Sequence, residues 1–227
     1  MLAFVFAQLL LLAQTPTDAV ERAYQTEFEN ARVRVTRVRY APREKLPTHG
    51  HPANPTVYVY LRDSGPVRFI HTGEEAFTLM RPAVRAGGFR LSKGAVETHS
   101  IESFSDRPTE YLRVELKGLT VDRQVFRGRF PPEPASARRN AQKVRYEDKQ
   151  VRITRVNCAA RRPCAGLSAR DTASLLVALT PSQLRSADAG AEVTLALGQT
   201  LWSEAGAAPP FSNSSNRPAE FLRIDLK

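Results

Sequence analysis

Cysteine is scarce in this chain: among 227 residues only Cys158 and Cys164 occur. Their spacing in NCAARRPC differs from CxxC, which excludes zinc-ribbon and thioredoxin-like redox proteins. Two interpretations remain, a local disulfide, which an exported protein would favour, and two free thiols at a strand end. Because the closed loop is short, the disulfide would add only about 2 kcal/mol of stability on the chain-entropy model.

Long hydrophobic runs are also missing, since none reaches the roughly 20 apolar residues of a membrane-spanning helix. The longest, Leu2 to Ala13, is followed by the small and polar stretch Thr15 to Ala19. This pattern predicts a secretory signal over residues 1–19, with cleavage after Ala13 or Ala19. No cysteine follows the run, so a lipid anchor is not expected. We therefore expect a periplasmic or extracellular protein without a transmembrane anchor. The run lacks preceding Lys or Arg, which leaves a buried N-terminal helix as the alternative.

Acidic residues are too few to balance the basic ones: 23 Asp and Glu stand against 33 Lys and Arg, a formal net charge of +10. Clustered basic residues would indicate nucleic acid or another anionic partner. Here the arginines alternate along predicted strands with no aromatic-interleaved basic stripe. They are interpreted as solvated strand faces, and no nucleic-acid partner is expected. Attachment to anionic cell-envelope polymers remains an alternative. The arginines concerned are Arg32, Arg34, Arg113, Arg152 and Arg223.

What the chain does contain is a near-repeat of itself. FENARVRVTRV at 28–38 returns 118 residues later as YEDKQVRITRV at 146–156, and RPTEYLRVELK at 107–117 returns 110 residues later as RPAEFLRIDLK at 217–227. Two matched ends predict one unit duplicated in tandem, with a net loss of eight residues in the second copy. A mature chain of about 210 residues is long enough for two small domains.

The repeats have the alternation of β-strands. Leu112, Val114 and Leu116 alternate with polar residues, which indicates half-buried antiparallel strands with one polar face. In the opening strand the apolar parity changes between Val35 and Val38, which predicts a β-bulge. Frequent Pro and Gly favour short strands joined by turns. The predicted fold class is all-β.

The stretch from Gly118 to Lys143 includes FPPEPASARRNAQK and lacks an apolar period, so it predicts an interdomain connection with a boundary near Pro134. The predicted domains are residues 20–133 and 134–227. Four apolar residues of the stretch could nevertheless cover a sheet edge, namely Val121, Val125, Phe126 and Phe130.

All four histidines lie in the first copy. His49 and His51 are two residues apart, so in a strand both imidazoles face the same side. His99 comes from another strand, which a closed sheet could bring opposite the pair. Three neutral imidazoles suit divalent Fe, Mn, Ni, Cu or Zn and leave coordination positions open. His71, in RFIHTGEE, is interpreted as structural or surface-exposed.

These residues resemble a known family. PTHGHP, a β-run to Gly65, then Gly94 and His99 resemble the two sequence motifs of a cupin, and the whole mature chain resembles a tandem two-domain cupin, or bicupin. The resemblance implies two tandem antiparallel jelly-roll barrels. It also implies that His49, His51 and His99 are metal ligands inside the first barrel.

The chain departs from the cupin motifs at three places. Pro55 or Thr56 occupies the position of the family's glutamate ligand, Gly94 precedes His99 by five residues instead of three, and Ser103 replaces an asparagine. Cupins that resemble cysteine dioxygenase manage with three histidines, so these departures do not exclude a metal.

Glu97 is a candidate for the missing carboxylate, because it shares strand parity with His99. The alternative interpretation of Glu97 is a solvent-facing turn residue.

The second copy has lost the site. The repeat offsets place Leu167, Ala169 and Pro209 at the three histidine positions. We therefore expect a second barrel packed with apolar side chains and without metal. Trp202 and Phe211 are interpreted as core residues or as walls of an organic-ligand pocket.

These observations predict an exported bicupin that binds a divalent transition metal in its first barrel. Three neutral ligands leave the charge of the metal uncompensated, which favours a small anionic or chelating substrate and dioxygenase-like oxidoreductase chemistry. No catalytic residue or organic cofactor is assigned, and Tyr58 and Tyr60 are either pocket or structural residues. The alternative is a non-catalytic bicupin that binds a small molecule or serves a structural or interaction role. A monomer or a homodimer is expected.

Overall fold

A computed structural model describes residues 16–73, 76–122, 124–133, 139–168, 170–187, 190–207 and 209–227. Within these ranges one α-helix, α1 (Pro16–Ala23), and one 3-10 turn, η1 (Ala165–Leu167), accompany eighteen strands. The all-β prediction is confirmed. Most of the predicted signal lies outside the described residues, and within them no helix combines the length and hydrophobicity needed to cross a membrane.

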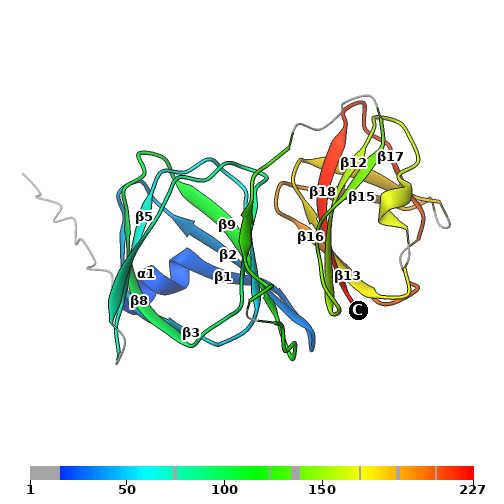
Figure 1. Cartoon of the computed structure of the whole chain (residues 1–227). Helices are drawn as coiled ribbons and strands as arrows, with labels where there is room; N and C mark the ends of the chain where they lie inside the picture. Colours follow the sequence, from blue (N-terminus) through cyan, green and yellow to red (C-terminus); the bar gives the residue numbers. More distant parts are fainter. Residues whose placement is uncertain are drawn as a thin grey trace, which may run out of the picture.

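The first half forms two antiparallel sheets that face each other, with α1 beside them (Figure 1). The six-stranded sheet has the order β1 (Tyr24–Glu29), β2 (Val33–Tyr40), β9 (Thr109–Leu116), β4 (Thr56–Tyr60), β7 (Phe89–Ser92) and β10 (Gly128–Phe130). The four-stranded sheet has the order β3 (Lys45–His51), β8 (Glu97–Ser103), β5 (Val67–His71) and β6 (Phe77–Arg81).

The second half has the same plan, but its sheets contain fewer strands. Its five-stranded sheet has the order β11 (Ala141–Glu147), β12 (Val151–Cys158), β18 (Ala219–Leu226), β13 (Ala173–Ala178) and β16 (Thr200–Ser203). Its three-stranded sheet has the order β15 (Glu192–Leu195), β14 (Ser182–Ser186) and β17 (Phe211–Asn213). Two tandem antiparallel barrels are therefore present, while the boundary near Pro134, outside the described residues, stays a prediction.

The largest hydrophobic cluster lies between the two halves, where the large sheet of one packs on the large sheet of the other. At its margin Phe28 stacks on Trp202 with ring centroids 6.4 Å apart, and Arg155 Nη1 donates a hydrogen bond to the Gly87 carbonyl at 2.7 Å. Each large sheet thus buries both faces. The cluster includes Val33, Val35, Val57, Leu112, Val114, Leu116, Val151, Ile153, Leu175, Leu222 and Ile224.

Burial on both faces explains the parity change in the opening strand. Val33 and Val35 face the shared core, whereas Val38 and Tyr40 belong to the interior cluster of the first barrel. Strand β2 pairs with β9 without interruption, and the irregularity lies in the neighbouring strand β1. The predicted bulge in β2 was therefore wrong. The change in apolar parity reflects burial in two different cores, and β2 contains no extra residue.

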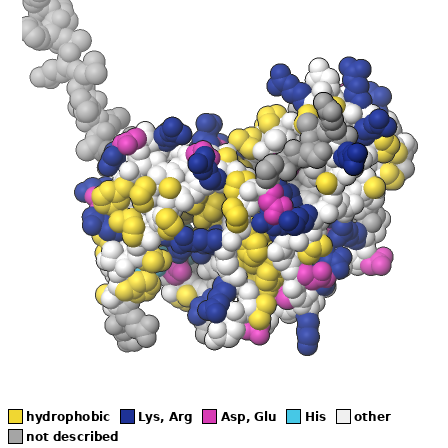
Figure 2. Space-filling view, turned by 45° about the horizontal axis from the view of Figure 1, so that its top comes forward, with side chains coloured by type: hydrophobic (Ala, Val, Ile, Leu, Met, Phe, Trp, Pro, Cys, Tyr) yellow, Lys and Arg dark blue, Asp and Glu magenta, His cyan; other side chains and the backbone are white. Residues whose placement is uncertain are grey.

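The same arrangement corrects the interpretation of two arginines as solvated. Arg113 and Arg223 are 5% and 2% exposed, because the polar faces of β9 and β18 point into the barrels. Each is paired with a carboxylate two residues along its strand, Glu115 or Asp225. Elsewhere Lys and Arg are scattered over the visible face with Asp and Glu among them (Figure 2).

The first part of the predicted interdomain connection packs against the rest of the protein. Val121 and Phe126 are buried in the shared core, whereas Val125 is exposed. Strand β10 extends the six-stranded sheet beside β7, where Phe130 stacks on Phe89 with centroids 4.4 Å apart. This segment therefore belongs to the first barrel.

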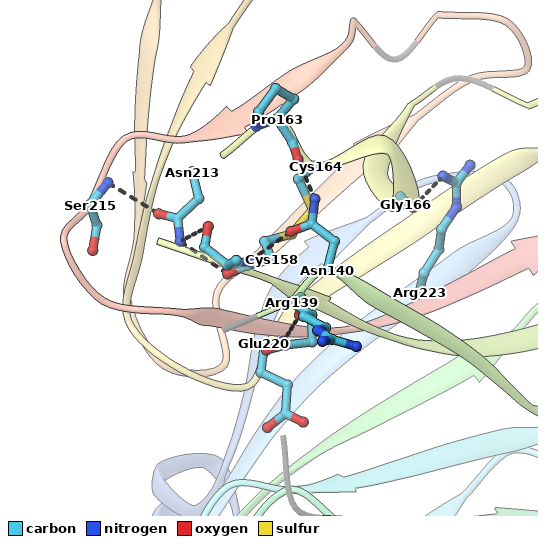
Figure 3. Close-up of a disulfide and its surroundings, with 12 residues drawn as sticks. Arg139, Asn140, Cys158, Pro163, Cys164, Gly166, Asn213, Ser215, Glu220 and Arg223 are labelled. Carbon is cyan, nitrogen blue, oxygen red and sulfur yellow. Dashed lines mark hydrogen bonds between the residues drawn. A yellow bond between two sulfur atoms is a disulfide. The ribbon is translucent and has the colours of Figure 1, made fainter. Parts of the chain in front are cut away.

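Cys158 and Cys164 form a disulfide, with Cα atoms 5.3 Å apart. Asn213 Nδ2 lies within hydrogen-bonding distance of the Cys158 carbonyl at 3.2 Å (Figure 3). It also lies 2.8 Å from the Arg217 carbonyl. Asn140 donates from Nδ2 to the Pro163 carbonyl at 2.6 Å (Figure 3). The disulfide and the two amide side chains fix the loop after β12 against β17.

Helix α1 is part of the first barrel. Ala23 is 1% exposed, and Ala19 packs against the interior cluster of this barrel. Signal cleavage after Ala19 would divide the helix, whereas cleavage after Ala13 would leave it whole. Export itself stays a prediction.

Candidate metal centre

Strands β3 and β8 bring three histidines together. His49 pairs directly with His99 across the two strands, and His51 follows two residues later on the same face. One ligand nitrogen from each ring lies within 4.8 Å of the others, and the three ring centroids are 4.9 to 5.2 Å apart. The predicted convergence of these histidines is therefore present. It is the sole group of this kind among the residues that the structure describes.

The histidine nitrogens are arranged as metal ligands would be. His49 Nδ1 lies 2.8 Å from the Pro47 carbonyl, to which it can donate, so that its Nε2 keeps a free lone pair. His49 Nε2 and both ring nitrogens of His99 are buried without a hydrogen-bond partner. Buried polar atoms are normally satisfied, so these unpaired nitrogens fit a metal ion.

The environment keeps the imidazoles neutral. Burial, followed by the nearby charge of Arg113, lowers the pKa of His51 to about 2. Burial, followed by His49, lowers the pKa of His99 to about 3. Burial also lowers the pKa of His49. Neutral imidazoles offer the lone pairs that a divalent ion needs.

Glu97 lies at the same site. It begins β8 opposite His51, its side chain is half-buried, and Oε2 is 3.7 Å from His99 Nδ1. It is therefore a strand residue that lines the interior and not an exposed turn residue. At the position of the missing family glutamate, the Thr56 hydroxyl instead donates to the Asn54 carbonyl at 2.8 Å.

His71, interpreted from sequence as structural or surface-exposed, is buried beside the three histidines. It lies on β5 opposite His99, with ring centroids 5.1 Å apart, and is 8% exposed. Its ring stacks on Phe77 at 4.2 Å, and its Nε2 is buried without a hydrogen-bond partner. Strand parity could have revealed it, because Val67, Phe69 and His71 alternate toward the interior.

A cavity of about 40 Å³ lies between the histidines and the large sheet. Tyr58 and Tyr60 are half-buried and line it, which answers the question left open from sequence. Its other polar walls include Glu97, three more tyrosines and three arginines, namely Tyr24, Tyr40, Tyr111, Arg81, Arg90 and Arg113. The site is therefore small, aromatic and rich in positive charge.

The interior of the second barrel combines an apolar cluster with the buried ion pair of Arg223 and Asp225. Leu167 and Phe211 are buried in its own hydrophobic cluster, and Pro209 is half-buried, while Ala169 lies outside the described residues. Trp202 packs against the shared core, with Nε1 donating to Glu204 Oε1 at 2.7 Å. This interior resembles a packed core.

No protein-family model matches the chain, and no curated protein is similar to it in sequence. Solved structures are similar in fold. AerE from Microcystis aeruginosa is 14% identical, with a TM-score of 0.59 over 90% of this chain and 97% of that one. Salicylate 1,2-dioxygenase from Pseudaminobacter salicylatoxidans is 10% identical, with a TM-score of 0.57 over 90% and 76%. A mutant of Bacillus subtilis oxalate decarboxylase OxdC is 12% identical, with a TM-score of 0.58 over 86% and 69%. These neighbours are cupin proteins, and this chain has the cupin fold in tandem, as its sequence predicted.

Proposed function

We propose that the first barrel binds a divalent transition metal through His49, His51 and His99 and acts as a dioxygenase-like oxidoreductase on a small anionic or chelating substrate. The observation that carries the proposal is the convergence of neutral imidazoles whose buried nitrogens have no other partner. Three histidine ligands leave positions open for substrate oxygen atoms.

The bound metal would supply Lewis acidity and a redox centre for dioxygen chemistry. The residues of the chain hold and enclose that centre. The hydrogen bond from His49 to the Pro47 carbonyl fixes the orientation of the ring. Glu97 is close enough to His99 to orient that imidazole or to serve as a further ligand. The tyrosine walls limit access of water, which strengthens electrostatic interactions within the cavity.

The similarity in fold to salicylate 1,2-dioxygenase and oxalate decarboxylase supports the proposed substrate class, because the names of both enzymes describe chemistry on small carboxylic acids. The disulfide between Cys158 and Cys164 supports the further proposal that the chain is exported, because such bonds persist in oxidising compartments.

Elemental analysis tests whether the protein binds a metal. The full chain would be analysed for Fe, Mn, Ni, Cu and Zn beside the double variant His49→Ala/His51→Ala. Arg217→Met, at an exposed position of the second half, is the control that keeps the histidine site intact. We expect about one metal ion per chain, lost in the double variant and retained in the control. Oxygen uptake with small carboxylates and diketones would then test turnover.

The opposite result has a clear meaning. If no metal binds even after reconstitution with each ion, the enzyme proposal is wrong. The non-catalytic bicupin, a small-molecule-binding or structural protein, would then account for the fold.

A further inference from the structure

Two further arginines line the cavity beside the histidines. Arg81 ends β6, in the same sheet as the histidines, and Arg90 lies on β7 of the opposite sheet. Both line the cavity that His51 and His99 also line. A ligand in this cavity could therefore contact the metal centre at one end and both guanidinium groups at the other.

These two arginines differ from the other interior arginines in having no carboxylate partner. No ion pair joins Arg81 or Arg90 to an acid anywhere in the described ranges. Arg90 is 9% exposed, and the Nε atoms of both residues are buried without a hydrogen-bond partner. The arginines that do have carboxylate partners are Arg37, Arg113, Arg155 and Arg223.

Aromatic rings hold the two guanidinium groups in place. Arg90 lies over the ring of Tyr58 at 3.9 Å, and Arg81 lies over the ring of Phe69 at 5.0 Å. A guanidinium that contacts a ring with its face keeps its edge available for in-plane donation to a carboxylate.

The electrostatics also favour an anion. Burial, followed by the like charge of Arg90, lowers the pKa of Arg81. Glu97, which lines the same cavity, partly offsets the charge of Arg81. Burial opposes the charge of Arg90, but Tyr58 and Tyr60 raise its pKa, so both arginines remain cationic. Because neither forms an ion pair with a described carboxylate, a bound anion would relieve their mutual repulsion.

From this arrangement we propose that Arg81 and Arg90 form the carboxylate-binding subsite of the first barrel and determine its specificity for small organic acids. The identity of the ligand as the substrate rests on the proposed function, but anion binding by the arginines does not require the metal. The small cavity favours a compact acid that presents a carboxylate to the arginines and, in the metal-loaded protein, oxygen donors to the ion that the histidines would hold.

Isothermal titration calorimetry with malonate tests the subsite. The full chain would be titrated both after chelator treatment and after loading with Mn²⁺. The variants Arg81→Met and Arg90→Met would be titrated in the same way. The control is Arg217→Met, which changes an exposed arginine in the second half. We expect malonate to bind the metal-free protein, with affinity at least about tenfold weaker in either interior variant and unchanged in the control. Neutral malonamide should not bind, and inorganic phosphate should bind more weakly than malonate if a planar carboxylate is the intended ligand.

Thermal unfolding separates lost recognition from lost structure. Removing an unpaired buried charge should leave the melting temperature of Arg90→Met equal to or above that of the wild type. Failure of malonate to bind the wild type, or equal affinity in the wild type and both interior variants, would overturn the subsite. Arginine-dependent malonate binding without any metal binding would retain the subsite and reject the proposed enzyme. Metal binding together with malonate affinity that does not depend on the arginines would reject the subsite and leave the proposed metal centre standing.

Discussion

Acidification should destabilise the metal-free protein through His99. The side chain is 3% exposed, and burial, followed by His49, lowers its pKa to about 3 from the ordinary 6.5. Between these two values the unfolded chain binds a proton that the folded chain does not. The contribution of His99 to stability is therefore complete above pH 6.5 and is lost as the pH falls toward 3.

The magnitude follows from the two pKa values. At pH 4.5 the unfolded imidazole is about two units below its pKa, whereas the folded imidazole is still neutral. One pKa unit corresponds to about 1.4 kcal/mol, so His99 alone should lower the free energy of unfolding by about 3 kcal/mol relative to pH 7.5. Glu29, whose pKa is lowered to about 2 chiefly by a hydrogen bond from Arg34, loses its contribution only below about pH 4.5.

Urea unfolding of chelator-treated wild type and His99→Gln at pH 7.5 and pH 4.5 measures the effect. The wild type should lose about 3 kcal/mol more than the variant between the two pH values. Between pH 7.5 and 8.5 the difference between the two proteins should be constant, which serves as the internal control. Parallel pH dependences of wild type and variant down to pH 4.5 would refute the reasoning, because His99 would then titrate alike in both states.

Three further predictions test the framework of the two barrels. Gly94→Ala should cost about 3 kcal/mol, because Gly94 has φ +77° and an added Cβ would lie 2.5 Å from the Asn54 carbonyl group; an unchanged melting temperature would contradict this. Replacing Cys158 and Cys164 by serine should lower the free energy of unfolding by about 2 kcal/mol, and reductant should then no longer affect stability; continued sensitivity to reductant would contradict the assignment. Ile224→Ala, at a fully buried position of the shared core, should cost about 2–5 kcal/mol in urea unfolding, and a loss below about 1 kcal/mol would mean that the two large sheets are not tightly packed.

The sequence predicted the histidine site because its geometry is local. His49 and His51 are two residues apart, and strand parity alone places them on one face. The third ligand depended on resemblance to the cupin motifs, since no local rule says which strands of a closed barrel are neighbours. The same resemblance supplied the tandem barrels, which alternation alone would have left as a set of unpaired strands.

Periodicity could not predict which strand face meets solvent. Arg113 and Arg223 share a parity opposite to the apolar residues, and the usual inference is that such a face is hydrated. In this chain the apolar face meets the other half and the polar face meets a barrel interior. The subsite formed by Arg81 and Arg90 was missed for a related reason, because its two members lie on opposite sheets and their relation depends on tertiary packing.

The separation of the shared core from the barrel interiors constrains how such a chain can change over time. The interior cluster of the second half and the cluster between the halves consist of different residues. During evolution the residues of one barrel interior can therefore be replaced while the strands between the halves keep their apolar faces. Fission into two free-standing halves is disfavoured, because each would present a large apolar sheet to water. The second half thus remains indispensable as a cover even where its own interior carries no ligands.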